Sequence, residues 1–505
     1  MNRIFNSRSG FSSAAVSGLM AVLLVLAGCS MAPTYNKPDA AAPEAYKEAA
    51  NPQANNWKTA QPSEQIARGA WWSVFDDAAL NELEQRALSA NQSLKAAAAR
   101  VQEARAFQQT ARAGLFPTLD AGLGAQRGRP SRVSQGLPDG APLPIQNSYS
   151  AGVTASYEVD LFGRVADSVK SASAEAQQSD ALLRSVQLAL QADVAQNYFT
   201  LRELDAELDV YTRTVTLREA GLKLVQRRFT EGQISELDVA RAESELATAR
   251  SDTMTVQRLR AASEHGLAVL LGEAPARFSF APHPLTAVDI HIAPGLPSSL
   301  LERRPDIAAA ERKMAAANAR IGVAKSAFFP SLTLTGAGGL ASGTAGDLFN
   351  WSSRTFLLGP LAALPLFDGG RRKGNLAKAR AQYEEEVANY RQQVLVAFQE
   401  VEDNLSNLRI LQGQMLTQAD AVKASNRAAS LSRTQYKEGA VNYLDVIDAE
   451  RTVLQSQRAA LQLAGAQAVS TVNLIRALGG GWGDAPAAQT AAMPTTQAAQ
   501  QIALQ

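Results

Sequence analysis

Residues 229–243 read FTEGQISELDVARAE, and residues 436–450 read YKEGAVNYLDVIDAE. The Glu-Gly pair, the Leu-Asp-Val triplet and the Ala-Glu pair recur at one constant offset of 207 positions. A shifted copy further upstream relates Phe116-Pro117 to Phe329-Pro330. A repeat of this length indicates that a whole structural unit was duplicated, so an interpretation of one half must also fit the other.

A long helical run precedes each copy. Between Gly163 and Gly232 there is no proline, Gly221 is the one interior glycine, and apolar residues recur in steps of three and four. A run of about 68 residues gives a helix of about 100 Å at 1.5 Å per residue. The second half repeats this run from Gly374 to Gly439, and both runs end in glycine, a frequent residue at helix C-termini.

A second helix follows each long run. It is expected to begin near Ser235 in the first half and near Asn442 in the second, and to end before Gly272 and Gly479. The sequence therefore predicts two very long helical hairpins, with tips at residues 230–238 and 437–445.

Short segments between the helices alternate in polarity. Every second residue from Ser148 to Leu161 is apolar, which predicts a strand over about 148–162 with one apolar and one polar face. Its antiparallel partner is expected at about 117–127, and the duplicate hairpin at about 330–340 and 355–367. Strands of about ten residues with an apolar outer face are typical of outer-membrane barrels. A pair of soluble edge hairpins has the same pattern.

Four strands cannot close a barrel in lipid, because open edges leave backbone groups without partners. A barrel therefore requires more than one copy of the chain. Two copies would supply eight strands and three copies twelve, and the sequence pattern does not decide between them.

The amino terminus predicts where the protein is delivered. Arg3 and Arg8 precede an apolar run that is too short to span a bilayer, so residues 1–28 are expected to be a secretory signal peptide. The run ends in Leu26-Ala27-Gly28-Cys29, which resembles a bacterial lipobox, and Cys29 is the only cysteine of the chain. We expect Cys29 to carry N-acyl and S-diacylglycerol lipid, and Ser30 after it favours the outer membrane. The alternative is an incidental cysteine beside an ordinary cleavage site.

Composition argues against several classes of function. The chain has 49 basic and 48 acidic residues, which gives no electrostatic reason to expect nucleic acid as a partner. Its three histidines, His265, His283 and His291, lack the spacing of metal ligands. No phosphate-binding glycine loop or nucleophile elbow is present. We therefore expect neither an enzyme nor a cofactor, and energy must come from a partner.

Several motifs in a fixed order resemble one known family. Besides the lipobox and the duplicated tips they are Trp71-Trp72-Ser-Val-Phe75-Asp76 leading to Leu80 and Leu83, Phe116-Pro117, Asp160-Leu-Phe-Gly163, Arg303-Arg-Pro-Asp306, Phe329-Pro330 and Pro365-Leu-Phe-Asp368. Together they resemble the TolC-like outer-membrane factors, in particular the lipoprotein branch that serves RND-type multidrug efflux pumps.

The resemblance implies a homotrimer with a helical and a β part. Its twelve-stranded transmembrane β-barrel would stand in the outer membrane on a twelve-helix periplasmic tunnel. The domains expected are a lipid-anchored tether over 29–75, a first repeat over 76–272, a linker over 273–299, a second repeat over 300–480 and a disordered tail over 481–505. A periplasmic adaptor and an inner-membrane RND-type transporter would be partners.

The hairpin tips carry the expected gate. Asp238 and Asp445 stand where simple helix capping also accounts for an acidic residue. Asp448 lies one turn beyond Asp445, on the same helix face, and its counterpart in the first repeat is Arg241. The second hairpin therefore presents two stacked carboxylates that the first one does not.

The resemblance implies a role for each tip residue. Asp445 and Asp448 would form carboxylate rings that select cations, Leu444 and Tyr443 would add an apolar constriction, and Tyr436 with Asp238 would help hold the inner hairpin closed. Val441 stands where TolC has an arginine in the closing network, so that bond must be absent or supplied by Lys437. The surface around the tips would contact the adaptor, through Gly232, Gln233, Gly439 and Ala440.

Three functions are compatible with these patterns. The first is a passive exit duct of a drug efflux machine, and the second is an exit duct for secreted proteins that works with an ATP-driven transporter. The third is a non-conducting lipoprotein that braces the cell envelope. The resemblance favours the first.

Overall fold

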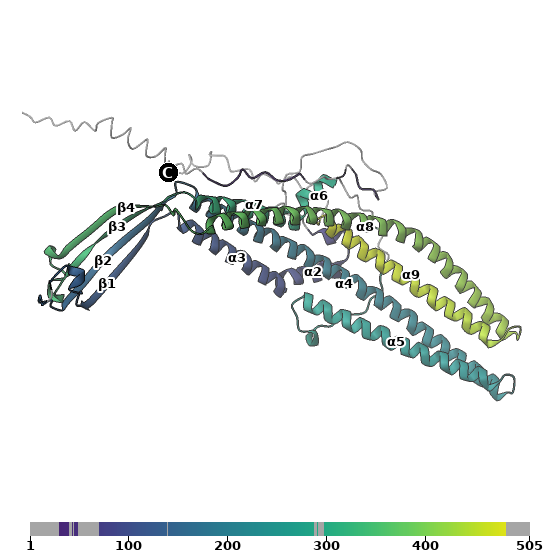
Figure 1. Ribbon diagram of the computed structural model, residues 1–505. Helices are drawn as coiled ribbons and strands as arrows, with labels where there is room; N and C mark the ends of the chain where they lie inside the picture. Colours follow the sequence, from purple (N-terminus) through teal and green to yellow (C-terminus); the bar gives the residue numbers. More distant parts are fainter. Residues whose placement is uncertain are drawn as a thin grey trace, which may run out of the picture. The chain divides into compact units, whose positions relative to one another are not determined.

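The computed structural model describes residues 30–39, 43, 45–48, 70–138, 140–286, 290 and 297–480. The predicted signal peptide, Cys29, most of the tether and the predicted tail lie outside these ranges. The helices and strands, in chain order, are α2 (Ala78–Ala90), α3 (Gln92–Ala113), β1 (Thr118–Gly128), β2 (Gln146–Val159), α4 (Arg164–Thr230), α5 (Glu236–Leu270), α6 (Pro297–Arg303), α7 (Pro305–Ser326), β3 (Ser331–Ser342), β4 (Arg354–Ala363), α8 (Arg371–Lys437) and α9 (Tyr443–Ala477) (Figure 1).

The duplication is visible in the lengths of the helices. Helices α4 and α8 each have 67 residues, and α5 and α9 each have 35. Both pairs start and end at the offset of 207 positions that the tip motifs share. The predicted long hairpins are confirmed, including the helix starts directly after Ser235 and Asn442.

One loop explains why the upstream copy is shifted. Helices α3 and α7 and the first residues of β1 and β3 are related by 213 positions rather than 207. The loop between β1 and β2 spans 17 residues, 129–145, whereas the loop between β3 and β4 spans 11, 343–353. The extra six residues therefore lie in the first strand–strand loop.

The four strands form one antiparallel sheet in the order β1-β2-β3-β4. The register places Ala121 opposite Val153, Val153 opposite Gly338 and Gly338 opposite Phe356, so these residues share one face of the sheet. The apolar residues of β2 lie on that face together with Leu119, Leu123, Leu334 and Phe356. Leu123 is 85% exposed and Phe356 84% exposed in the single chain. The predicted strands and their pairing are confirmed, and the sheet leaves its apolar face uncovered.

Three element boundaries lie three or more residues from their predicted positions. Strand β2 ends at Val159 rather than 162, because the Asp160 carboxylate accepts hydrogen bonds from the backbone N–H groups of Val165 and Ala166 at the start of α4. Helix α8 begins at Arg371, before Gly374. The Asp368 carboxylate accepts hydrogen bonds from the N–H groups of Gly370 and Arg372, which fixes the helix start there. The expected strand over 355–367 accordingly ends earlier, at Ala363.

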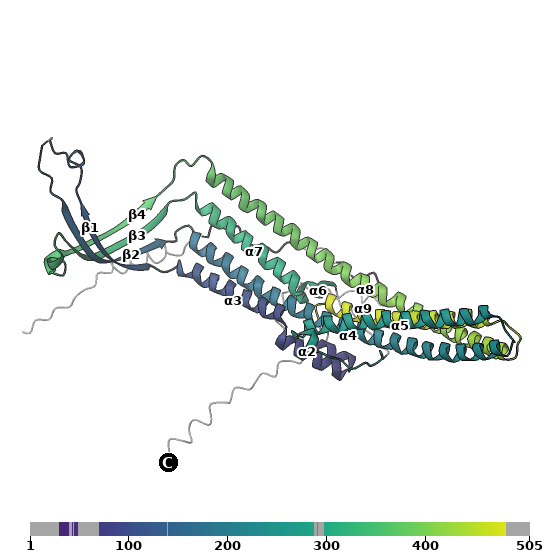
Figure 2. The same cartoon turned by 90° about the horizontal axis from the view of Figure 1, so that it is seen from below.

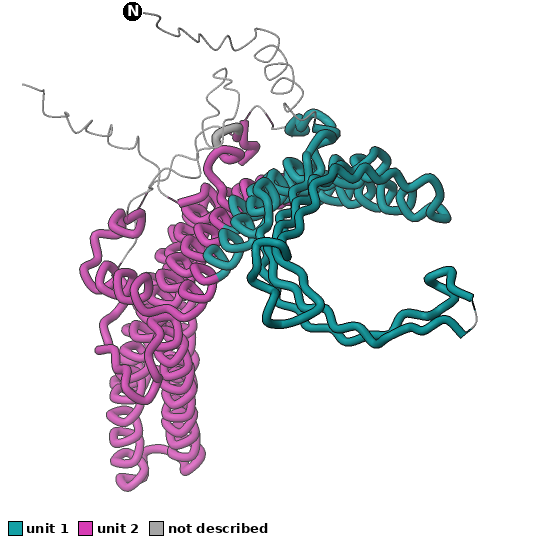
Figure 3. The backbone as a smooth tube through the Cα atoms, turned by 90° about the vertical axis from the view of Figure 1, so that its left-hand side faces the viewer, with its two compact units in different colours: residues 1–39, 100–179, 310–390 teal, residues 40–99, 180–309, 391–505 magenta. Residues whose placement is uncertain are grey.

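The chain divides into two compact units, each built from both repeats (Figure 3). Unit 1 comprises Met1–Asp39, Arg100–Ser179 and Ala310–Tyr390. It contains the sheet and four helix segments that lie side by side in the order α3, α4, α7, α8 (Figure 2). Unit 2 comprises Ala40–Ala99, Asp180–Ala309 and Arg391–Gln505, and it contains both hairpin tips. Among the residues that the structure describes, no helix is both long and apolar enough to cross a membrane.

Helix α9 packs along α4 within unit 2. The Gln196 amide donates to Asn473 at 3.0 Å, and the Gln462 amide donates to Glu207 at 2.9 Å. Closer to the tips, the Arg458 guanidinium lies 5.3 Å from the centre of the Tyr211 ring. These contacts hold the second hairpin against the long helix of the first and bring the two tips together.

Candidate functional site at the helix tips

Each tip is a short loop closed by a helix cap. In the first tip the Ser235 hydroxyl accepts a hydrogen bond from the Leu237 N–H at 3.2 Å. In the second tip Asn442 and Asp445 form a reciprocal capping box, in which the Asn442 N–H donates to the Asp445 carboxylate at 3.0 Å. Capping therefore accounts for the position of Asp445. Asp238 makes an ion pair with Arg241 instead, at 3.5 Å.

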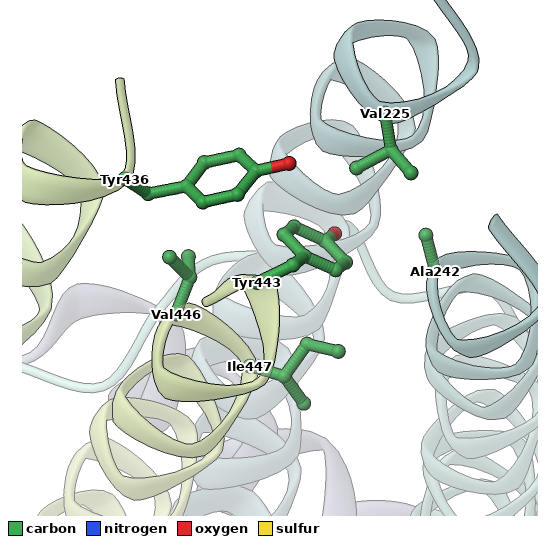
Figure 4. Close-up of a cluster of buried hydrophobic side chains, with 6 residues drawn as sticks. All are labelled: Val225, Ala242, Tyr436, Tyr443, Val446 and Ile447. Carbon is green, nitrogen blue, oxygen red and sulfur yellow. The ribbon is translucent and has the colours of Figure 1, made fainter. Parts of the chain in front are cut away.

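A buried apolar cluster joins the two tips (Figure 4). Tyr436 of α8 and Tyr443, Val446 and Ile447 of α9 meet Val225 of α4 and Ala242 of α5. The two tyrosine rings lie 5.3 Å apart and tilted by 49°. Because the cluster draws side chains from all four helices, its apolar contacts stabilise the second hairpin against the first.

Arg228 of α4 adds a polar connection between the tips. Its guanidinium donates hydrogen bonds to the carbonyl oxygens of Tyr436 at 3.1 Å and Lys437 at 3.0 Å, and it lies 4.7 Å from the centre of the Tyr436 ring. These carbonyls lie in the last turn of α8, where a cation is favourable. The Tyr436 carbonyl also accepts a hydrogen bond from the Gly439 N–H at 3.1 Å. The closing bond was expected to be absent or supplied by Lys437. Among the described residues the Lys437 side chain makes no such bond, and Lys437 contributes only its carbonyl oxygen, which accepts from Arg228.

Tyr436 and Asp238, both expected to help hold the inner hairpin closed, do not bond to each other within the described part of the chain. The Tyr436 hydroxyl is buried and has no hydrogen-bond partner within the described part of the chain. Burial raises the pKa of Tyr436, and the charge of Arg228 opposes that shift. Tyr436 therefore contributes its ring to the cluster, while Asp238 pairs with Arg241 on its own helix.

The opposite side of α9 is exposed. Leu444, Asp445 and Asp448 all face away from the buried Tyr443, Val446 and Ile447, and the Asp448 side chain is 62% exposed. The structure thus brings three of the predicted constriction residues onto one free surface of the second tip. The fourth, Tyr443, lies in the buried cluster on the other side of the helix. Two carboxylates and a leucine at the end of a helix present both charge and an apolar surface to solvent or to further copies of the chain.

The residues expected to contact an adaptor also lie at the tips. Gly232, Gln233, Gly439 and Ala440 are exposed in the two loops. Gly232 and Gly439 have φ angles of 73° and 77°, a left-handed conformation that glycine adopts without strain. The glycine of the repeated Glu-Gly pair, which identified these turns in the sequence, is therefore required by the backbone conformation of each turn.

Sequence reasoning missed the residues that connect the hairpins. Arg228 is one of two adjacent arginines in the last turn of α4, and its counterpart in the second repeat is Gln435. Helical periodicity places a residue on a face but does not identify the partner across the interface. The one available signal was the difference between the repeats, because Arg228 of the first repeat is replaced by Gln435 in the second.

Comparison with known proteins gives concordant results. The model of the outer membrane efflux protein family matches residues 83–273 and 296–480. The antibiotic efflux pump outer membrane protein ArpC of Pseudomonas putida is 36% identical over 467 residues, which cover 92% of this chain and 95% of ArpC. The outer-membrane channel OprN is 30% identical and superposes with a TM-score of 0.82, over 90% of this chain and all of OprN. The open state of the MtrE channel of Neisseria gonorrhoeae is 31% identical and gives a TM-score of 0.76, over 90% of this chain and 98% of MtrE.

Proposed function

Because this chain belongs to the outer membrane efflux protein family, we propose that it is the exit duct of a tripartite efflux pump and has a gate at its helix tips. It would conduct drugs or other small molecules passively from a periplasmic adaptor and an RND-type inner-membrane transporter to the outside. Relatives such as ArpC are named as outer membrane proteins of antibiotic efflux pumps, which supports this class of cargo.

The sheet supports assembly as a homotrimer. Its order leaves β1 and β4 as unpaired edges, and its apolar face is exposed along Leu123 and Phe356. Both features are unfavourable in a single chain, because an open edge leaves backbone groups unpaired and an apolar surface faces water. Pairing of β1 with β4 of the next copy satisfies the edges, and lipid covers the apolar face. Three copies give the twelve strands that the family resemblance implies.

The segment that follows Cys29 supports a lipid anchor close to the β-sheet. In unit 1 the Ser30 hydroxyl donates to the Asp167 carboxylate at 2.6 Å, and Asn318 donates to the Pro33 carbonyl at 2.8 Å. A Cβ at Gly322 would lie 2.7 Å from the Ala32 nitrogen, so this glycine permits the close approach. Asp167 belongs to the first turn of α4, directly after β2. Lipid on Cys29 would therefore enter the bilayer beside the strands.

The exposed group of Leu444, Asp445 and Asp448 carries the proposal of a gate. These side chains lie on the free surface of α9, while the opposite face of the helix is fixed by the apolar cluster and by Arg228. Three copies around one axis would bring six carboxylates together at the periplasmic entrance, where rings of acidic side chains favour cations. Opening would move the second hairpin outward and separate it from Arg228.

Complementation tests the proposed function. The gene is expressed in a Gram-negative host that lacks its own exit duct but retains an adaptor and an RND-type transporter, and drug susceptibility is measured. Restored resistance that disappears when the tip residues Gly232 and Gly439 are both replaced by proline supports an efflux duct. If resistance is not restored while an exported protein substrate reaches the medium, the secretion duct is the correct function.

A further inference from the structure

A buried carboxylate of the first hairpin is held by arginines from two other helices. Arg218 of α4 donates to the Glu245 carbonyl at 2.6 Å and lies 3.0 Å from its carboxylate. From the other side, the Arg451 Nε of α9 donates to the Glu245 carboxylate at 3.0 Å, and its Nη2 contacts the same oxygen. Glu245 and Arg218 are buried, whereas the Arg451 side chain is 57% exposed.

Arg451 also faces the tip carboxylate of its own helix. Its Nη1 lies 3.5 Å from the Asp448 Oδ1, one turn closer to the tip. A single guanidinium therefore stands between Glu245, which belongs to the first hairpin, and Asp448, which belongs to the exposed surface of the second. When the hairpins separate, Arg451 can stay with only one of these partners.

We propose that Arg451 is a movable latch that passes from Glu245 to Asp448 when the tips open. This inference rests on the proposed gate and adds a closing residue to it. In the closed arrangement Arg451 ties α9 to α5. In the open arrangement it neutralises Asp448 instead, so that opening of the duct and the charge of its entrance change together.

The charges around Arg451 keep the free-energy cost of this transfer small. Breaking a buried ion pair is costly mainly because the remaining charge is left without compensation. Glu245 keeps its bonds to the buried Arg218 after Arg451 leaves, and Arg451 keeps Asp448. No charge is left unpaired in either arrangement, as a reversible latch requires.

The latch exists in only one of the two repeats. The positions that correspond to Arg451 and Glu245 by the offset of 207 are Ser244 and Thr452, and the counterpart of Arg218 is Ser425. Duplicated hairpins with equal lengths have therefore diverged at the residues that connect them. This is expected if one hairpin moves and the other serves as its support.

The test measures conductance and ion selectivity of the full-length protein in planar bilayers under a KCl gradient. The variants are Arg451→Ala and Glu245→Gln, with Arg451→Gln as a second removal of the charge that keeps most of the side chain. The matched control is Arg250→Ala, which breaks an ion pair with Glu219 at 2.7 Å inside the first hairpin. Each variant is first checked for a detergent-stable oligomer.

All three latch variants should conduct about threefold to tenfold more than the wild type. Each loses one partly exposed ion pair per subunit, which shifts the equilibrium between the closed and open states. Arg250→Ala should conduct like the wild type. The selectivity changes have opposite signs. Arg451→Ala leaves Asp448 without its cation and raises the preference for cations, whereas Glu245→Gln leaves Arg451 with Asp448 alone and lowers it.

Two results would overturn the latch. One is wild-type conductance for both Arg451 variants, and the other is a rise of cation preference in Glu245→Gln. The tip variant Arg228→Ala separates this failure from failure of the proposed function. If Arg228→Ala conducts strongly while the Arg451 variants do not, only the latch is wrong. If no variant and no wild-type oligomer conducts, the gated duct itself is wrong.

Discussion

Gly221 of α4 faces the hydroxyl group of Tyr443, the first residue of α9, at close range. A Cβ built on Gly221 would lie 3.2 Å from the Tyr443 Oη, which is tighter than most real contacts of this kind. Gly221 is the one glycine inside α4, where glycine costs about 1 kcal/mol relative to alanine. The glycine therefore gives up helix stability and allows the second tip to approach the first.

Replacing Gly221 by alanine should loosen the tip. We expect Gly221→Ala to displace Tyr443 and to raise single-channel conductance about twofold, because the apolar cluster packs less closely. Gly413→Ala is the matched control, since a Cβ at Gly413 meets nothing within 4 Å. Adding Tyr443→Phe, which removes the crowded hydroxyl, should return Gly221→Ala to wild-type conductance. Unchanged conductance in Gly221→Ala would show that this contact does not set the closed position.

Removing Arg228 should open the tip more strongly. Arg228→Ala loses two charge-assisted hydrogen bonds to the end of α8, which contribute about 2 kcal/mol together with the contact to the Tyr436 ring. We expect about a thirtyfold rise in the open fraction, since each 1.4 kcal/mol is about a factor of ten, and single-channel recording measures it. Arg227→Ala is the control, because Arg227 is exposed and bonds to Lys223 of its own helix. Equal conductance of the two variants would contradict the assignment of Arg228.

Tyr436→Phe should leave the gate closed. The Tyr436 hydroxyl is buried without a partner in the described part of the chain, so its removal takes away no hydrogen bond and relieves the cost of burying a polar group. We expect wild-type conductance and an equal or higher melting temperature. A large increase in conductance would instead show that the hydroxyl bonds to a group of a neighbouring subunit.

The sequence predicted the helices well because their limits depend on local residues. Ser235 and Asn442 are capping residues, and Gly232 and Gly439 occupy left-handed turns, so each signal acts within a few positions. The start of α8 was misplaced at Gly374 because the cap is formed by Asp368, whose two bonds to backbone N–H groups act earlier in the chain.

The candidate site was predicted only in part, because local signals reveal its exposed residues but not the contacts between distant parts of the chain. The exposure of Leu444, Asp445 and Asp448 follows from helical periodicity, and the capping role of Asp445 follows from its distance to Asn442. The partners across the hairpins do not. Arg228 meets residues 436 and 437, which are more than two hundred positions away, and the choice of partner depends on how α4 packs against α8.

Glu84 should make the stability of the protein depend on pH. The side chain is completely buried in α2, both carboxylate oxygens lack partners within the described residues, and burial raises its pKa from 4.5 to about 9. Between these values the folded chain holds a proton that the unfolded chain releases. The contribution of Glu84 to stability is therefore complete below pH 4.5 and is lost as the pH rises towards 9, by at most about 1.4 kcal/mol per pH unit.

Thermal unfolding between pH 5 and pH 9 measures this dependence. Glu84→Gln should flatten the decline in melting temperature, because it carries no titrating group. Glu82→Gln, which alters an exposed glutamate on the same helix, should retain the wild-type slope. An identical slope in all three proteins would mean that the Glu84 carboxylate finds a partner in the assembled protein.

Ion selectivity in a planar bilayer tests the central claim most directly. The wild-type oligomer is compared with an Asp445→Asn, Asp448→Asn double variant, in which the asparagine at position 445 retains an oxygen that can cap α9. The account predicts a cation-preferring wild-type channel and a variant that conducts without that preference. A folded, oligomeric protein that carries no current, or a variant with undiminished preference for cations, would contradict a gated duct with its entrance at these carboxylates.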